Sequence, residues 1–286
     1  MRLMSPVRRL TLLMPLLFAT LAPLATVSAQ TAGAPFTIGV MPNLSARVIL
    51  TNYQPMRAYF ERELKRPVEI FTAGDLRSFS EQTQRGDFAL VVTAANLGRV
   101  AQLDAKWEPL AIYEPQVPGV IVALASNADS SLKQLRGKAL AVANPPSLVA
   151  VAGLHWLGVQ GLQLGADYKT VVTPNDDSLG AVLLSGEAPL AVMSMGEFRA
   201  RPEALRNTLR IVTEFAKVPG FLVMANPVLP AAERQRLRAL LLAFGQSDEG
   251  RRFQSLAGIT LIREVTEAEL KALDNVTEAT RKALGG

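Results

Sequence analysis

Neutral polar residues recur at one kind of position in this sequence, directly after short apolar runs that predict strands and just before predicted helices. Five such turns fall at residues 42–45, 93–96, 145–147, 175–178 and 194–196. In open α/β sheets, ligands bind beyond the carboxyl ends of the strands. Backbone N–H groups and the dipole at a helix start attract anionic groups. The pattern therefore predicts a binding site for a small polar or anionic molecule.

One or two residues from four of these turns are our candidate ligand contacts. They are Asn43, Thr93, Asn96, Ser147 and Ser194. The competing interpretation of each is a plain helix N-cap, because Ser, Thr, Asn and Asp are preferred there in any case. The functional interpretation requires several of them to face a common cleft.

Four charged or titratable residues have alternative roles. Of Asp176 and Asp177, one is expected to cap the following helix and the other could accept a hydrogen bond from a ligand. Arg47 could pair with an anionic group of the ligand or remain a surface cation. His155, the only histidine, is expected to be a packing or surface residue of a helix over 148–160.

Several classes of enzyme site are excluded or lack a signature. The chain has no cysteine and one histidine, which excludes a Cys/His zinc site, a thiol nucleophile and a disulfide framework. It contains no dinucleotide fingerprint, no Gly-Lys-Ser/Thr phosphate loop and no G-x-S-x-G elbow. We therefore expect no catalytic residue, metal or cofactor. A periplasmic hydrolase is the alternative from another class, with Asp75, Asp176 and Glu197 as its only candidate acids.

The first 29 residues have the pattern of a secretory signal peptide. Arg2, Arg8 and Arg9 form a basic region, an apolar run covers 10–24, and Val-Ser-Ala at 27–29 resembles a cleavage site. The apolar run is short for a membrane anchor and contains two prolines. The mature chain is expected in the periplasm. Without the three leader arginines it has 27 basic and 25 acidic residues, a net charge of +2 that predicts no nucleic-acid partner.

Strands alternate with helices along the chain, which predicts an α/β architecture with mostly parallel sheets. The phrase Val-Pro-Gly followed by an apolar run occurs at 117–123 and again at 218–224. We interpret these as two crossover strands between lobes that close over a ligand. The expected domains are the leader (1–29), a discontinuous first lobe (30–117 and 225–286) and a second lobe (118–224).

Two local expectations concern the boundaries of helices. Asn52 is predicted to cap a helix that continues through Leu64. A helical tail is predicted over 248–256 and 266–284.

The arrangement resembles the periplasmic solute-binding proteins of the phosphate/phosphite/phosphonate class, which serve ABC importers. The resemblance extends from Thr37 to about Ile262 and depends on these segments: Ile-Gly-Val-Met-Pro at 38–42, Tyr-Gln-Pro-Met at 53–56, Arg-Gly-Asp-Phe-Ala-Leu at 85–90, the crossover strands, Leu-Arg-Gly-Lys at 135–138, Ser-Gly-Glu at 185–187 and Glu-Gly-Arg at 249–251. It implies a type II periplasmic-binding-protein fold with two lobes.

The chain departs from that family in its ligand loop. Where the family has Ser-Thr-Ser, this chain has Ser147-Leu148-Val149-Ala150. The aromatic residue expected after Asp75 is Leu76. The acidic residue expected after Gly-Glu is also absent, since the stretch reads Gly186-Glu187-Ala188-Pro189. Leu148 and Val149 are expected to give the cleft apolar surface and to favour a larger ligand with fewer anionic oxygens.

The resemblance implies a monomeric, non-enzymatic binding protein. Its ligand would be a small molecule, such as phosphonate, phosphite or phosphate, passed to an ABC permease and its ATPase. An alternative partner is a membrane sensor kinase or cyclase that responds to the ligand-bound form.

Overall fold

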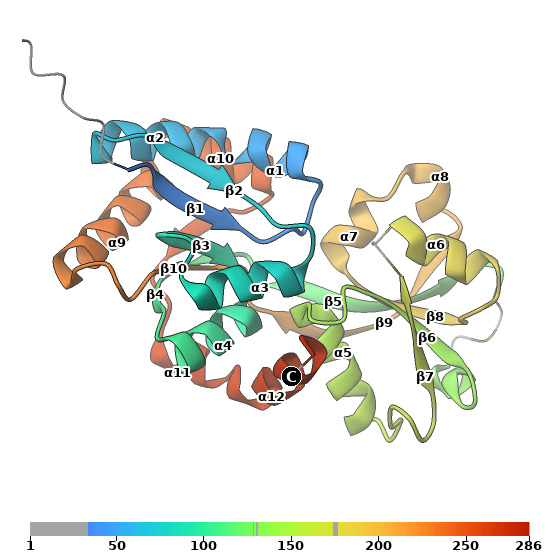
Figure 1. Cartoon of the computed structure of the whole chain (residues 1–286). Helices are drawn as coiled ribbons and strands as arrows, with labels where there is room; N and C mark the ends of the chain where they lie inside the picture. Colours follow the sequence, from blue (N-terminus) through green and yellow to red (C-terminus); the bar gives the residue numbers. More distant parts are fainter. Residues whose placement is uncertain (1–33, 128, 130, 174–176, 286) are drawn as a thin grey trace, which may run out of the picture. The chain divides into compact units, whose positions relative to one another are not determined.

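The computed structural model describes residues 34–285 except 128, 130 and 174–176 (Figure 1). The expected signal peptide and Asp176 therefore lie outside the described residues. Asp177 begins a helix, but its side chain is not described.

The strands form two separate sheets, and each sheet with its helices makes one lobe. The first sheet has the order β11-β4-β10-β3-β1-β2 and the second has the order β7-β6-β8-β5-β9. The strands of the first sheet are β1 (Phe36–Val40), β2 (Val68–Phe71), β3 (Leu90–Thr93), β4 (Glu108–Glu114), β10 (Leu222–Ala225) and β11 (Leu261–Arg263). Those of the second are β5 (Val117–Leu124), β6 (Ala139–Ala143), β7 (Lys169–Thr173), β8 (Leu190–Ser194) and β9 (Leu209–Val218).

Helices connect the strands in both lobes. Those of the first lobe are α1 (Ala46–Asn52), α2 (Gln54–Leu64), α3 (Leu76–Arg85), α4 (Ala95–Ala105), α9 (Ala231–Gln246), α10 (Asp248–Ala257), α11 (Glu267–Lys271) and α12 (Asp274–Ala283). Those of the second are the 3₁₀ helix η1 (Leu132–Leu135), α5 (Leu148–Val159), α6 (Asp177–Leu184), α7 (Met195–Ala200) and α8 (Glu203–Arg206).

Each sheet is mixed. Strand β1 pairs in parallel with β2 and β3, and β6 pairs in parallel with β7 and β8, as expected for strands joined through helices. The strands that enter or leave a lobe, β4, β5, β9 and β10, make antiparallel pairs. The predicted parallel arrangement thus holds within two strand trios, β1 with β2 and β3, and β6 with β7 and β8. The strands that cross between the lobes pair antiparallel to their neighbours.

The two Val-Pro-Gly phrases begin at one pair of residues, where the chain passes between the lobes, and run away from it in opposite directions. In the antiparallel pair of β5 and β9, Val117 is the partner of Val218. The first phrase continues into the second sheet as β5, and the second phrase leads into the first sheet as β10. The chain therefore crosses and returns along one paired ribbon.

Both glycines of these phrases stand where another group approaches closely. A Cβ atom on Gly119 would lie 2.3 Å from Cζ of Phe215 on β9, and one on Gly220 would lie 2.1 Å from the Tyr113 carbonyl oxygen. No side chain fits at either position, which explains why the same small residue recurs in the two phrases.

Aromatic side chains from α2, α9 and α10 fill the core on one face of the first sheet. Phe253 is fully buried, with its ring centroid 5.0 Å from that of Tyr53 and 5.5 Å from that of Phe244. Tyr59 and Phe60 join the same cluster. Figure 1 shows α9 and α10 beside α2 and β1. This cluster fixes the C-terminal helices to the lobe that the N-terminal strands begin.

Two local predictions differ from the structure. Asn52 is the last residue of α1, a short helix that the sequence did not reveal, and Tyr53 stands at the N-cap of α2. The Asn52 amide instead donates to the Leu256 carbonyl at 3.4 Å. The predicted tail over 266–284 is interrupted between α11 and α12, and β11 precedes it as an edge strand on β4.

The aromatic core yields a stability prediction. Phe253→Ala should lower the free energy of unfolding by about 3–5 kcal/mol, because it removes a buried ring and leaves a cavity. Leu256→Ala on the same helix is the matched control; Leu256 is 44% exposed, so the change should stay within about 0.5 kcal/mol. Urea denaturation followed by circular dichroism measures both, and equal losses would contradict this description of the core.

Candidate ligand-binding site

The carboxyl ends of parallel strands define one edge of each sheet. Because β1, β2 and β3 are mutually parallel, the turns that follow them share an edge of the first sheet. The turns after β6, β7 and β8 share an edge of the second sheet in the same way. These are the edges at which α/β proteins bind ligands.

The turn after β1 is open to solvent. Asn43, Leu44 and Ser45 are all exposed, and Ser45 stands at the N-cap of α1 without a capping hydrogen bond from its side chain. The backbone N–H of Asn43 donates to the Met41 carbonyl at 2.9 Å, and the side chain is exposed. Arg47 on α1 is also exposed, as its surface interpretation requires.

Ser147 and Ser194 are helix N-caps. The Ser147 hydroxyl accepts from the Ala150 N–H at 3.2 Å at the start of α5. The Ser194 hydroxyl accepts from the Glu197 N–H at 3.0 Å, and the Glu197 carboxylate accepts from the Ser194 N–H at 2.6 Å, which completes a capping box. A capping hydroxyl keeps its own proton, so each serine still has a donor to offer.

Thr93 and Asn96 are covered by protein. Thr93 ends β3 and is 2% exposed, and Asn96 near the start of α4 is fully buried. The Asn96 amide nitrogen donates to the Pro146 carbonyl at 2.9 Å and to the Thr280 hydroxyl at 2.9 Å. Of the five candidates, the structure thus brings Asn96 together with the turn that contains Ser147.

Leu148 packs against the first lobe. It is 6% exposed and belongs, with Val151, to the apolar cluster that also contains Ala94, Ala95 and Leu97. Val149 is partly buried at the margin of the same cluster. The apolar residues of this turn therefore join the two lobes in this arrangement, where the sequence predicted an apolar cleft lining.

The acidic candidates act as helix caps wherever they are described. Asp75 caps α3 and accepts from the Ser78 N–H at 2.7 Å, and this backbone hydrogen bond lowers the pKa of its carboxyl group. Glu197 is held in the capping box of α7. His155 is exposed on α5.

Three further residues, which the sequence did not mark as candidates, lie after elements that lead to or from the strand ends. Thr72 follows β2, and its hydroxyl is buried without a hydrogen-bond partner among the described residues. Asn144 follows β6 with a left-handed φ of 47°. Arg201, which follows α7, is 5% exposed. The strand-end rule alone would have found Thr72 and Asn144, whereas no local pattern marks Arg201 as buried.

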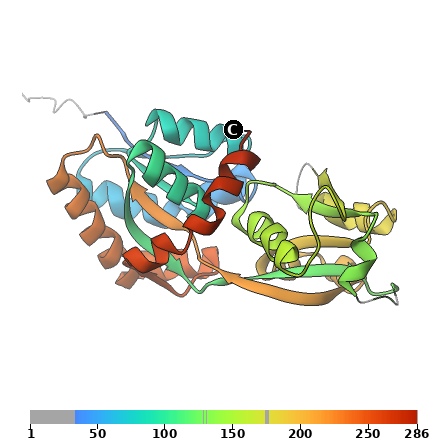
Figure 2. The same ribbon diagram turned by 90° about the horizontal axis from the view of Figure 1, so that it is seen from below.

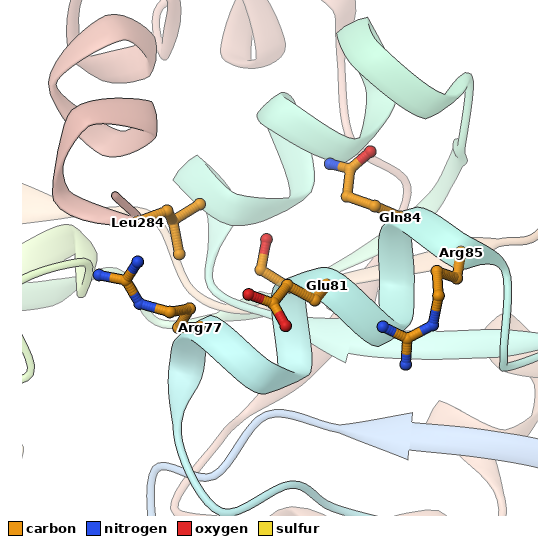
Figure 3. Close-up of a pocket in the computed structure, with 6 residues that line it drawn as sticks. Arg77, Glu81, Gln84, Arg85 and Leu284 are labelled. Carbon is orange, nitrogen blue, oxygen red and sulfur yellow. The ribbon is translucent and has the colours of Figure 1, made fainter. Parts of the chain in front are cut away.

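A surface pocket of about 310 Å³ lies away from the strand-end turns. Figure 3 shows side chains that line it. They come from α3 and the C-terminal end: Arg77, Ser80, Glu81, Gln84, Arg85 and Leu284. None of our five candidate contacts belongs to it.

The described ranges contain neither a metal site nor a membrane span. Over residues 34–285, apart from 128, 130 and 174–176, no three His, Asp or Glu side chains converge as a metal site would require. In the same part of the chain, no helix has the length and hydropathy needed to cross a bilayer.

Ion pairs anchor the first crossing strand beside the point where it leaves the first lobe. Glu114 ends β4, and its carboxylate accepts from Nε of Arg263 on β11 at 3.0 Å. The same guanidinium binds the Glu269 carboxylate at 2.6 Å and 3.1 Å. These contacts, chiefly the one with Arg263, lower the pKa of Glu269 to about 2.

The geometry defines a class of protein. Two α/β lobes with parallel strand trios, joined by a pair of crossing strands, make up a two-lobed periplasmic-binding-protein fold. The sequence matches the family "ABC transporter, phosphonate, periplasmic substrate-binding protein" over residues 38–270. The chain therefore belongs to this family of substrate-binding proteins.

Solved structures share the fold at low sequence identity. XAC2383 from Xanthomonas citri, bound to ATP, is 19% identical with a TM-score of 0.73 over 87% of this chain and 97% of that chain. PhnD1 from Prochlorococcus marinus, in complex with methylphosphonate, is 12% identical with a TM-score of 0.75 over 86% and 98%. The aliphatic sulphonate binding protein SsuA from Escherichia coli is 12% identical with a TM-score of 0.64 over 87% and 92%. A search of curated protein sequences gives no significant match.

The Arg263 network yields a pH prediction. A carboxyl group whose pKa is lowered by folding, here from 4.5 to about 2, stabilises the protein above pH 4.5 and loses that contribution as the pH falls toward 2. Glu269→Gln should therefore be less stable than the parent at pH 7, and the difference should shrink between about pH 5 and pH 2. Denaturant titrations at several pH values measure it.

Glu267→Gln on the same helix is the control. Glu267 is exposed and makes no ion pair among the described residues. Its stability difference from the parent should vary little over that range, and a similar slope for both variants would contradict the role given to Arg263.

Proposed function

We propose that this protein is an exported binding protein that captures a small oxyanion between its two lobes and delivers it to an ABC importer. The carrying observation is the family match over residues 38–270, which includes the strands of both sheets and both crossings. Delivery to an importer is preferred over docking on a membrane sensor, because the family description names an ABC transporter component.

The chemistry shared by the similar structures supports an oxyanion ligand. Their names mention methylphosphonate, aliphatic sulphonate and, for SsuA from Xanthomonas axonopodis, MOPS. Phosphonates and sulfonates both present a tetrahedral anionic group that accepts hydrogen bonds. The present chain offers matching groups at the strand ends, in the form of neutral amides, hydroxyls and helix starts.

The proposed contacts fall into two groups. Asn43 is exposed beside β1 and Ser147 is half-buried at the start of α5, whereas Ser194 is buried, with 7% of its surface exposed. Thr93 and Asn96 are buried, so they would meet a ligand only after the lobes separate. Ligand entry in this proposal requires rotation of the lobes about the crossing strands.

The remaining parts of the proposal come from the sequence. We assign residues 1–29 to a cleaved signal peptide, the first lobe to 30–117 and 225–286, and the second lobe to 118–224, except that β10 (Leu222–Ala225) pairs within the first sheet and so belongs to the first lobe. The mature protein would work in the periplasm as a monomer without catalysis. A hydrolase would need an acidic pair free for chemistry, and two of its three candidate acids, Asp75 and Glu197, accept hydrogen bonds as caps.

Ligand stabilisation tests this function. The mature protein should melt at a higher temperature in the presence of at least one of methylphosphonate, phosphite, phosphate or an alkanesulfonate. A ligand at a hundred times its dissociation constant adds about 2.7 kcal/mol, roughly 5–10 °C for a chain of this size. An unchanged melting temperature with all four, confirmed by calorimetry at millimolar ligand, would overturn the oxyanion assignment.

A pair of variants tests the proposed contact at Asn43. Asn43→Ala should weaken binding of the ligand found in that screen by roughly tenfold or more, because a hydrogen bond to a charged group contributes about 1.5–3 kcal/mol. Asn275→Ala is the control, since Asn275 is exposed on α12 and makes no side-chain contact in the described part of the chain. Equal affinity in both variants would remove Asn43 from the site.

A further inference from the structure

The C-terminal segment, β11 through α12, runs along the first lobe under several restraints. Arg263 ties its beginning to Glu114 at the end of β4. Asp274 at the start of α12 pairs with the nearly buried Arg99 of α4 at 2.7 Å and 3.2 Å. Arg281 near its end pairs with Asp104 of α4 at 2.6 Å and 3.0 Å. Helix α12 is therefore fixed to α4 at both ends.

The same helix reaches the second lobe. Figure 2 shows α12, in dark red, between the green helices of the first lobe and the yellow-green helix α5, which agrees with its contacts to α4 and α5. Leu273 and Val276 of α12 share an apolar cluster with Leu148 and Val151 of α5. The lobes thus meet at a second place besides the crossing strands.

Asn96 lies at the centre of this meeting place. Because the Pro146 carbonyl can only accept, the side-chain nitrogen of Asn96 must face it, which fixes the orientation of the amide. The Thr280 hydroxyl donates to the Val276 carbonyl at 2.8 Å, so it accepts from the same nitrogen. One NH₂ group therefore connects α4, α12 and the turn before α5.

One feature of this junction destabilises the docked arrangement. The Asn96 side-chain oxygen is buried and has no hydrogen-bond partner among the described residues. A buried acceptor without a partner is unfavourable, and water would satisfy it once the turn at Pro146 moved away. Apolar packing and the hydrogen bond from Asn96 to Pro146 favour docking, while the unpaired oxygen favours separation. The bond from Asn96 to Thr280 lies within the first lobe and orients the amide.

We propose that the hydrogen bond from Asn96 to the Pro146 turn, with Thr280 orienting the Asn96 amide, forms a latch that holds the second lobe docked on α4 and α12 when no ligand is bound. The lobes open about the paired crossing strands when this latch releases. Opening uncovers Asn96 at the start of α4, so the latch sets how often that part of the strand-end edge is accessible. The latch is independent of ligand identity, and its failure would leave the proposed function untouched.

Distance measurements in the ligand-free protein test the latch. The chain has no cysteine, so cysteines introduced at the exposed Leu50 of α1 and Leu184 of α6 carry a unique pair of spin labels, one on each lobe. Asn96→Asp keeps the size of the side chain but replaces the donor with an acceptor facing the Pro146 carbonyl. Its distance distribution, measured by double electron–electron resonance, should be broader and shifted to longer distances.

Two further variants make the result decisive. Thr280→Val removes one acceptor of the Asn96 nitrogen and should shift the distribution in the same direction by a smaller amount. Thr277→Val is the matched control, because the Thr277 hydroxyl makes the same bond to its own helix, to Leu273 at 3.0 Å, without touching Asn96.

The proposal is overturned if Asn96→Asp, which removes the donor to Pro146, gives the same distribution as the parent. If the Asn96→Asp protein does not fold, Asn96→Leu takes its place, because it removes the donor to Pro146 without adding a charge. An unchanged distribution in that variant overturns the proposal in the same way. A shift in Thr280→Val with none in Thr277→Val supports the latch.

Discussion

The antiparallel pairing of β5 with β9 is the constraint on which the two-lobed arrangement depends. The chain leaves the first lobe and returns to it at Val117 and Val218, which are partners in this pair. Because main-chain hydrogen bonds join the two crossing segments to each other, they twist as a pair, whereas two unpaired linkers would move independently. Gly119 and Gly220 allow this because each faces a group that leaves no room for a side chain.

Much of the fold could be predicted from local sequence. Alternating strands and helices indicated two α/β lobes, and the repeated Val-Pro-Gly phrase marked both crossings. Strand direction could not be predicted for β10 and β11, because an apolar run carries no information on its partners. Helix α1 was missed because Ile49 is its only buried residue, so it has no apolar stripe. The break between α11 and α12 contains no Gly or Pro, so no local residue type predicted it.

The site was predicted less completely than the fold. Capping residues and ligand-binding residues are of the same types, and the structure shows that Ser147 and Ser194 do cap helices. Sequence could not show that Asn96 is covered by a turn 50 residues away. That contact depends on how two lobes meet, which leaves no spacing in the chain. The apolar substitution at Leu148 has a similar explanation, since the residue faces the other lobe.

The start of α4 has a consequence for how a solute would be bound. Alanine stands at its N-cap, where no side chain can accept from the first N–H groups, and residues 94–97 are buried. Such groups need an acceptor from outside the helix. When the Pro146 turn covers them, water is kept away from this helix start. An anion bound at this helix start would therefore have to displace the Pro146 turn. Its apparent affinity would depend on the free energy of displacing that turn as well as on the contacts of the anion with the protein.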